Sequence, residues 1–134
     1  MPRPHLTKVR VRLAETDALG VVYYGNYLGF FDIARLEMLR EVGIDLSFLK
    51  RRGLGFVAAE SSCRYLSSAK FDDLLTLEVR VSRVGGSSVT YEHKISKGRT
   101  RVAEGRVTDV LVGLGGKPAR IPDDIRERLL RFRV

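Results

Sequence analysis

The stretch Glu15–Glu37, ETDALGVVYYGNYLGFFDIARLE, places one carboxylate, Asp17, in a turn just ahead of an aromatic-rich helix. Five of the chain's eleven Phe and Tyr residues fall within nine positions of one another here: Tyr23, Tyr24, Tyr27, Phe30 and Phe31. A helix that is apolar on most sides must be covered by other structure. Its start also offers unpaired N–H groups beside an acid. The combination of carboxylate, amide donors and apolar wall makes this stretch the candidate reaction site.

The spacing of apolar residues predicts a helix from about Tyr24 to Val42, after a long turn over residues 14–26. One stripe of this helix, spaced by four, three, four and four residues, consists of Tyr27, Phe31, Ala34, Met38 and Val42. Further apolar side chains widen the surface past half a turn: Leu28, Phe30, Ile33, Leu36 and Leu39. Gly43 is a natural stop for the helix.

Strict alternation of apolar and polar residues predicts strands on both sides of this helix. Before it, residues 8–13 alternate, with Val9, Val11 and Leu13 on one face. After it and a basic loop at Asp45–Gly55, alternation returns and predicts strands over residues 56–66, 74–84, 88–97 and 102–113.

Turn and cap residues complete the pattern. Gly85 and Gly86 predict a hairpin between residues 74–84 and 88–97. Pro122, followed by two aspartates, predicts the start of a short C-terminal helix.

The order of one strand, a long helix and four antiparallel strands predicts a single α+β domain over residues 1–134. An antiparallel sheet of about five strands would wrap around one central helix. Because such a sheet leaves open edges, we expect self-association as a dimer or a dimer of dimers, that is, a homotetramer.

Composition narrows the class of protein. No apolar run approaches the roughly 20 residues of a membrane span. The N-terminus MPRPHLTKVRVRL has no apolar core of a secretory signal. The one cysteine, Cys63, cannot form an internal disulfide, so we expect a cytoplasmic protein.

The formal net charge of +8 raises the question of nucleic-acid binding. However, the basic residues are scattered along the chain, and the aromatic residues cluster elsewhere. There is therefore no basic stripe with interleaved stacking rings, and nucleic acid is disfavoured as a partner.

Two motifs carry a resemblance to a known family. The first is Asp17-Ala18-Leu19-Gly20-Val21-Val22-Tyr23, followed by Tyr27 and by Ala34–Arg40; the second is Tyr65–Asp73. With these motifs the chain resembles the hotdog-fold acyl-CoA thioesterases of the 4-hydroxybenzoyl-CoA thioesterase superfamily. It is most similar to the small bacterial branch associated with the Tol-Pal system.

The resemblance implies hydrolysis of an acyl-CoA thioester to acid and free CoA. It implies no metal and no cofactor, since coenzyme A is part of the substrate. Asp17 matches the family's catalytic carboxylate, which acts as a nucleophile or as a general base. Backbone N–H groups of Tyr24 and Gly25 would polarise the thioester oxygen as an oxyanion hole.

Further residues are expected around this centre. The substrate pocket is predicted to include Val22, Tyr23, Asn26, Tyr27 and Glu60. Many members of the family carry His at the position of Tyr24, so here the reaction is left to Asp17 and the backbone donors. The second motif also departs from the family, because Ser68 stands where proline is usual.

Structural interpretations compete with several of these roles. Asp17 could serve only as a turn or capping residue. For Asn26 a helix N-cap is favoured over a role in holding the turn. Cys63 lies in the middle of a predicted strand without a histidine partner, which favours a buried, inert thiol. With one cysteine and two histidines, no zinc site is expected.

Two other functions remain open from the sequence. A related enzyme would release acyl groups from acyl carrier protein, with the basic surface docking an acidic partner. A non-catalytic hotdog module would bind acyl chains or nucleic acid.

Overall fold

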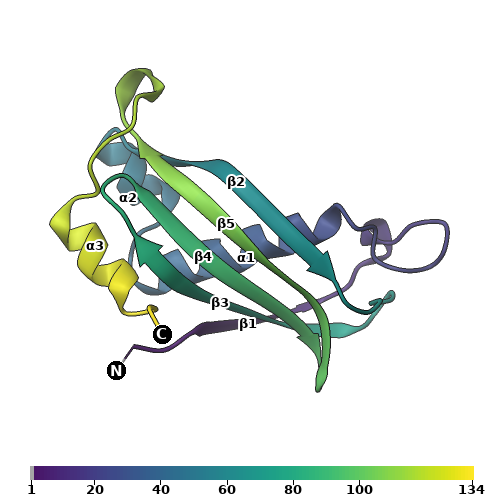
Figure 1. The fold of residues 1–134 in the computed structure, drawn as a ribbon. Helices are drawn as coiled ribbons and strands as arrows, with labels where there is room; N and C mark the ends of the chain where they lie inside the picture. Colours follow the sequence, from purple (N-terminus) through teal and green to yellow (C-terminus); the bar gives the residue numbers. More distant parts are fainter. Residues whose placement is uncertain (1) are drawn as a thin grey trace.

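The structure, a computed structural model, describes residues 2–134 as one five-stranded antiparallel sheet folded around a long helix (Figure 1). The strands are β1 (His5–Arg10), β2 (Gly55–Tyr65), β3 (Leu74–Val84), β4 (Ser88–Lys97) and β5 (Thr100–Val112). The helices are α1 (Asn26–Glu41), α2 (Leu46–Arg51) and α3 (Asp123–Leu130). The predicted α+β architecture is confirmed.

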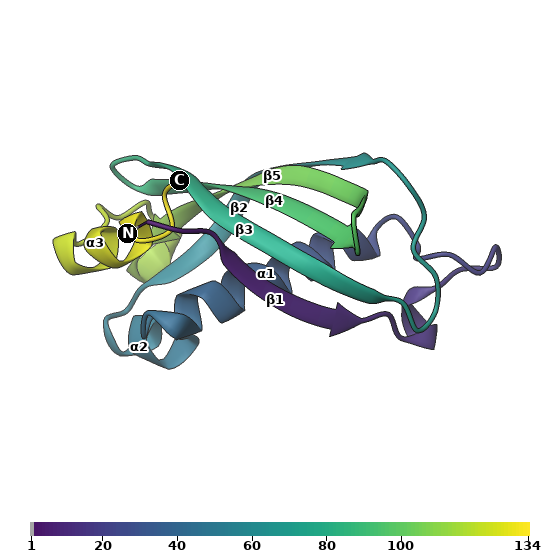
Figure 2. The same cartoon turned by 90° about the horizontal axis from the view of Figure 1, so that it is seen from below.

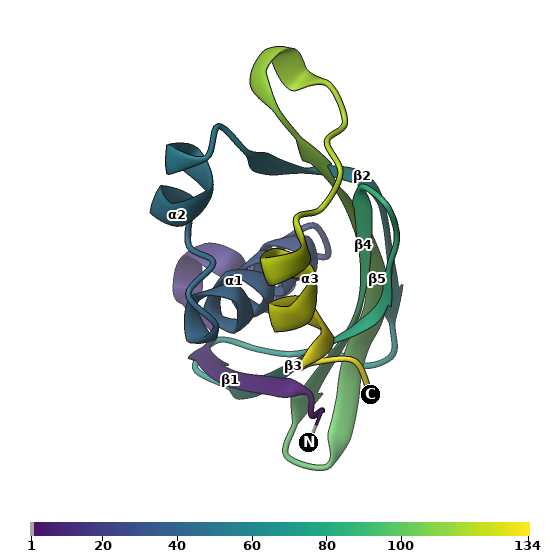
Figure 3. The ribbon, with the colours of Figure 1, turned by 90° about the vertical axis from the view of Figure 1, so that its left-hand side faces the viewer.

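The strand order is β1-β3-β4-β5-β2, so β3, β4 and β5 form a meander and two non-sequential strands form the edges. The sheet curls around one side of α1, and α2 lies near the open side (Figure 3). A view from below shows β1 and β3 running along α1 (Figure 2). Within residues 2–134, no helix combines the length and the apolarity that crossing a bilayer requires.

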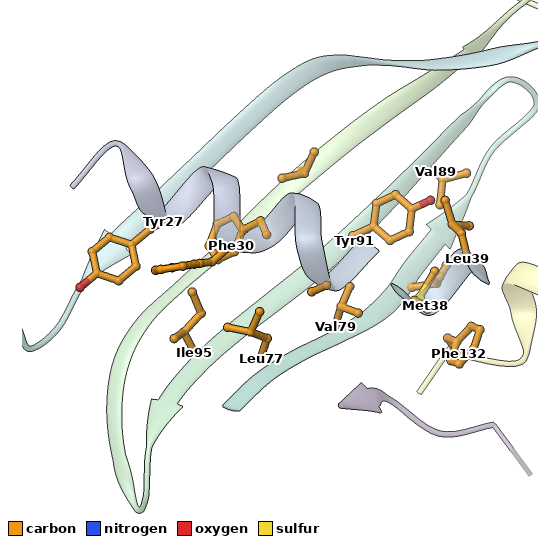
Figure 4. Packing of buried hydrophobic residues seen from close by; sticks show 14 of the residues in the cluster. Tyr27, Phe30, Met38, Leu39, Leu77, Val79, Val89, Tyr91, Ile95 and Phe132 are labelled. Carbon is orange, nitrogen blue, oxygen red and sulfur yellow. The ribbon is translucent and has the colours of Figure 1, made fainter. Parts of the chain in front are cut away.

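The core lies between α1 and the concave face of the sheet (Figure 4). The predicted helical stripe faces this core, since Tyr27, Phe31, Ala34 and Met38 are all buried. Opposite them, alternate residues of the central strands point inward: Leu75, Leu77, Val79, Val81, Val89, Tyr91, Ile95, Val107 and Leu111. This burial removes the apolar surface of one helix face and one sheet face from water, which drives the two to pack together.

Gly105 of β5 allows α1 to approach the sheet closely. It pairs with Cys63 of β2 and with His93 of β4. A Cβ atom built on Gly105 would clash with the carbonyl oxygen of Ser62 and lie only 2.6 Å from Cε2 of Phe31. The ring of Phe31 therefore occupies space that any other residue at this position would fill.

Two predicted boundaries on the N-terminal side are wrong. The first strand spans His5–Arg10 rather than residues 8–13, and Leu13 is exposed in a short 3-10 turn instead of facing the core. The prediction failed because the apolar–polar alternation of the sequence continues to Leu13, whereas the chain leaves the strand direction and enters the 3-10 turn at Arg12. The helix begins at Asn26 rather than Tyr24, because the residues before it form a hydrogen-bonded turn.

The predicted basic loop at Asp45–Gly55 contains a helix, α2. The Asp45 side chain accepts a hydrogen bond of 2.8 Å from the Phe48 amide, which is an N-cap. Leu49 points into the core. The basic residues Lys50 and Arg51 lie in the last turn, where their positive charges interact favourably with the negative end of the helix dipole. The prediction failed because a six-residue helix is too short to show a periodic apolar pattern.

The opposite side of α1 is only partly covered. Leu28, Ile33 and Leu36 of α1 remain exposed within the single chain. The neighbouring edge strand β2 is exposed or half-buried along its whole length. An apolar helix face next to a long open strand edge is a surface that associating proteins cover.

We expect Gly105→Ala to lower the free energy of unfolding by about 3 kcal/mol, because the added methyl forces α1 away from the sheet. Chemical denaturation measures this change. Gly29→Ala is the matched control, because a Cβ there meets nothing within 4 Å and a helical alanine should stabilise by roughly 0.5–1 kcal/mol. Equal stability of the Gly105→Ala and wild-type proteins would contradict this packing.

Candidate active site

The loop that carries Asp17 is closed by short hydrogen bonds. The Asp17 amide donates to the carbonyl of Val21 over 2.9 Å, and the Gly20 amide donates to the carbonyl of Asp17 over 2.9 Å. Gly20 has a φ of 80°, a left-handed conformation that suits glycine. The loop therefore presents Asp17 in a defined position.

The Asp17 carboxylate uses one of its two oxygens in this turn. Oδ1 accepts a hydrogen bond of 2.9 Å from the Leu19 amide. Oδ2 accepts none from any residue of the described chain, and the side chain is only half-buried. The turn interpretation and a chemical role are thus compatible, because one oxygen orients the carboxylate while the other stays available.

A second set of bonds joins this loop to the start of α1. The carbonyl of Glu15 accepts from the Tyr23 amide over 2.9 Å and from Nδ2 of Asn26 over 2.8 Å. The prediction of Asn26 as the N-cap is wrong, because Gly25 occupies the cap position without a side-chain bond. Asn26 instead holds the turn, the alternative that the sequence had left open.

The two amides expected to form an oxyanion hole precede the first helical residue. Among residues 2–134, the N–H groups of Tyr24 and Gly25 donate to no acceptor, whereas the amides of Asn26 and Tyr27 are satisfied. Both free donors lie at the positive end of the α1 dipole, where a developing negative charge is stabilised. Gly25 packs against the ring of Tyr23, whose Cε2 would lie 2.9 Å from an added Cβ.

Aromatic rings form a wall beside this helix start. The rings of Tyr23 and Tyr24 are 4.7 Å apart, and Tyr65 lies 6.0 Å from Tyr24 and 5.7 Å from Tyr27. A hydrogen bond with Tyr24 raises the pKa of Tyr23, and the charge of the nearby Asp17 adds to the effect. The four rings therefore form one aromatic cluster, which the bond from the Tyr23 amide to the Glu15 carbonyl ties to the Asp17 loop.

The sequence missed Tyr65 as a member of this wall. It is the last residue of β2, and only the tertiary fold brings it to the start of α1. Its place at the head of the second motif, Tyr65–Asp73, is the one signal in the sequence that points to it. The exposed surfaces of Tyr24 (61%) and Tyr65 (49%) leave room for a ligand to contact both rings.

The other predicted pocket residues are placed differently. Val22 is buried, and its amide donates to the carbonyl of Ala69 over 2.8 Å, so it anchors the loop. Glu60 is exposed on β2, where it pairs with Thr108 of β5, and its side chain forms no hydrogen bond or ion pair within residues 2–134. Cys63 is half-buried, and burial raises the pKa of its thiol, which disfavours the reactive thiolate.

Comparison with known proteins identifies the family. A family model described as the thioesterase-like superfamily matches residues 11–129, which includes the Asp17 loop, α1 and the whole meander. The chain belongs to this superfamily. The hotdog fold and the family membership predicted from the two motifs are thereby confirmed.

Individual relatives agree with the family. The chain is 36% identical over 120 residues to the acyl-CoA thioesterase YbgC of Haemophilus influenzae, covering 88% of each chain. It is 26% identical over 130 residues to a chloroplastic acyl-acyl carrier protein thioesterase of Arabidopsis thaliana, covering 96% of this chain and 68% of that protein. A probable thioesterase of Bartonella henselae has a crystal structure that superposes with a TM-score of 0.84 at 35% identity, covering 89% and 99% of the two chains.

We expect Asn26→Ala to loosen the loop, because the bond from Nδ2 to the Glu15 carbonyl is lost at a cost of about 1 kcal/mol. Hydrogen exchange of the Tyr23 amide should accelerate about fivefold, since that amide shares the same acceptor. Asn26→Asp, which cannot donate, should behave in the same way. Unchanged exchange in both variants would show that the side chain does not hold the loop.

Proposed function

We propose that the protein hydrolyses acyl-CoA thioesters to the free acid and coenzyme A, with Asp17 as the catalytic carboxylate. The observation that carries this proposal is the pairing of a partly free carboxylate with two unpaired amides at one helix start. The relationship to an acyl-CoA thioesterase at 36% identity supports the reaction class.

Asp17 has two possible routes to the same products. As a nucleophile, Oδ2 attacks the thioester carbonyl carbon, the thiolate of CoA leaves, and water then cleaves the mixed anhydride. As a general base, Oδ2 takes a proton from a water molecule that attacks the same carbon directly. In both routes the bond from Oδ1 to the Leu19 amide fixes the direction of the carboxylate.

The amides of Tyr24 and Gly25 would stabilise the negative charge that develops on the thioester oxygen. Removing one such donor in an oxyanion hole typically slows a reaction by about 100- to 1000-fold. The side chain of Tyr24 contacts the rings of Tyr23 and Tyr65, which fits a wall for the substrate. No step of this mechanism requires a metal or a redox group.

The assembly that we propose is a dimer formed along β2 and the exposed face of α1, or a pair of such dimers. The apolar residues exposed on these elements include Ile33 and Leu36 of α1 and Val57 of β2. β2 is an edge strand of 11 residues, long enough to pair with a second copy.

An acyl group carried by acyl carrier protein is the second candidate substrate. The net charge of +8 and the relationship to an acyl-acyl carrier protein thioesterase favour it. Rates on matched acyl-CoA and acyl-carrier substrates separate the two. The cytoplasmic location inferred from the single cysteine stays a prediction.

We expect Asp17→Asn to lower kcat/KM for acyl-CoA hydrolysis by at least about 1000-fold, because the amide neither attacks nor takes a proton. Thiol release over a panel of acyl and aryl CoA thioesters measures the rate. Asp72→Asn is the matched control: Asp72 also lies in a turn, and asparagine tolerates its φ of 71°. A folded Asp17→Asn protein with the wild-type rate would refute the role of Asp17.

The assembly has its own test. We expect sedimentation to give a mass of at least twice the 15.1 kDa of one chain. Leu36→Glu should shift the equilibrium toward a single chain at micromolar concentration, because it places a charge in the apolar interface. Leu6→Glu, at an exposed leucine of β1 on the opposite edge of the sheet, should leave the mass unchanged. A wild-type protein that sediments as one chain would contradict the proposed dimer.

A further inference from the structure

Three exposed apolar side chains lie at the end of the sheet where β1 stops and β3 begins. Leu13 is 70% exposed, Phe71 is 54% exposed and Leu74 is 43% exposed. Val11 exchanges two backbone hydrogen bonds of 2.9 Å with residues 72–73, so the segments that carry these side chains run beside each other. Single exposed apolar residues are ordinary, but a group of them marks a surface that contacts something. We call this surface the β1-end patch.

A closed turn presents Phe71 to solvent. The Lys70 amide donates to Oδ2 of Asp73 over 2.8 Å, and the Asp73 amide donates back to the Lys70 carbonyl over 3.1 Å. Asp72 has a φ of 71°, which is uncommon for a residue other than glycine. The exposed ring is therefore held by an ordered turn.

Basic side chains surround the β1-end patch. Residues 8–13, 70–74 and 97–99 contain two aspartates and six exposed basic residues: Lys8, Arg10, Arg12, Lys70, Lys97 and Arg99. Three of these cations pair with carboxylates, Arg10 with Asp72 at 3.9 Å, Arg12 with Glu15 at 3.2 Å and Lys97 with Asp73 at 3.0 Å. The other three form no ion pair within residues 2–134. The patch thus combines apolar side chains with unpaired positive charge.

The β1-end patch lies beside the Asp17 loop and away from the proposed dimer face. The Val22 amide donates to the carbonyl of Ala69 over 2.8 Å, and Val21 forms a β-bridge with Lys70. Figure 2 shows the end of β1 at the same end of the molecule as the loop before α1. Because β1 and β2 are opposite edges of the sheet, a dimer along β2 forms on the other edge.

The charge of the patch selects its partner. A second copy in patch-to-patch contact would bring like charges together, which is unfavourable. A nucleic acid would pair with the cations, but its phosphates and sugars would not take up the leucines. An anionic phospholipid surface matches both features, because its headgroups attract lysine and arginine while the acyl boundary accepts apolar side chains.

We propose that the β1-end patch docks the protein on an anionic phospholipid bilayer. Leu13, Phe71 and Leu74 would enter the boundary between headgroups and acyl chains, and the surrounding cations would contact the headgroups. Docking would bring the Asp17 loop to the bilayer surface, where amphipathic acyl-CoA molecules collect; this consequence rests on the proposed function. The docking itself is measured without substrate, so its failure is distinct from a failure of hydrolysis.

Flotation with lipid vesicles tests the docking. Phosphatidylcholine vesicles with about 30% phosphatidylglycerol should bind the protein at least about tenfold more tightly than pure phosphatidylcholine vesicles. Raising NaCl from about 0.05 M to about 0.5 M should weaken the binding to the anionic vesicles by at least about tenfold, because salt screens the headgroup charges. No binding to anionic vesicles, or equal binding to both kinds, would overturn the proposal.

Tryptophan substitutions locate the contact, since the chain contains no tryptophan of its own. In Phe71→Trp, anionic vesicles should shift the emission to shorter wavelength, and lipids brominated on their acyl chains should quench it. Leu114→Trp is the matched control, because Leu114 is 89% exposed beyond the far end of β5, a strand that spans roughly 40 Å. Its emission should not be quenched. Equal quenching of the two variants, or quenching of Leu114→Trp alone, would contradict docking through the patch.

Charge reversal separates the patch from the net charge of the chain. Lys70→Glu should weaken binding to anionic vesicles by at least about tenfold, since two units of charge change at the contact. Lys117→Glu makes the same change in net charge at an exposed lysine of the loop after β5, and it should weaken binding by less than about threefold. Equal losses in the two variants would show that net charge drives the binding, against the proposal.

An acidic protein is the alternative partner for a basic, apolar patch. Acyl carrier protein without its acyl group is the probe for this case. If the wild-type protein binds this carrier and Lys70→Glu weakens that binding, while anionic vesicles are not bound, the assignment of the patch to lipid is wrong.

Discussion

The contact between Phe31 and Gly105 is the constraint on which the rest of the structure depends. Because Gly105 of β5 has no side chain, the ring of Phe31 can lie directly against this strand. This contact sets the depth of α1, which spans about 24 Å at 1.5 Å per residue. The candidate active-site loop is joined to the start of this helix.

At the start of α1, backbone geometry does most of the positioning. The carbonyl of Glu15 holds the loop and the helix together through two donors, and the Leu19 amide directs one oxygen of Asp17. The tyrosines then supply an apolar wall that is half open within one chain.

Strong periodicity made most of the fold predictable. The strands with strict alternation, β3 and β4, have the predicted bounds, and the buried stripe of α1 was correctly assigned. Short elements were not predictable, because α2 depends on a single cap at Asp45 and the turn at Leu13 depends on a bend that no pattern marks. Within the candidate site, the motif singles out Asp17, whose role stays a prediction. Tyr65 was missed because only the tertiary fold joins it to α1.

The central claim is that Asp17 and the two free amides act on one carbonyl group. A crystal structure with a non-hydrolysable ketone analogue of an acyl-CoA, in which a CH2 group replaces the thioester sulfur, tests it most directly. The account predicts the analogue's carbonyl oxygen about 2.7–3.1 Å from the amide nitrogens of Tyr24 and Gly25. It also predicts Oδ2 of Asp17 about 3–3.5 Å from the carbonyl carbon, or one water molecule away from it. A carbonyl group that binds away from both amides, with Asp17 facing solvent, would contradict the account.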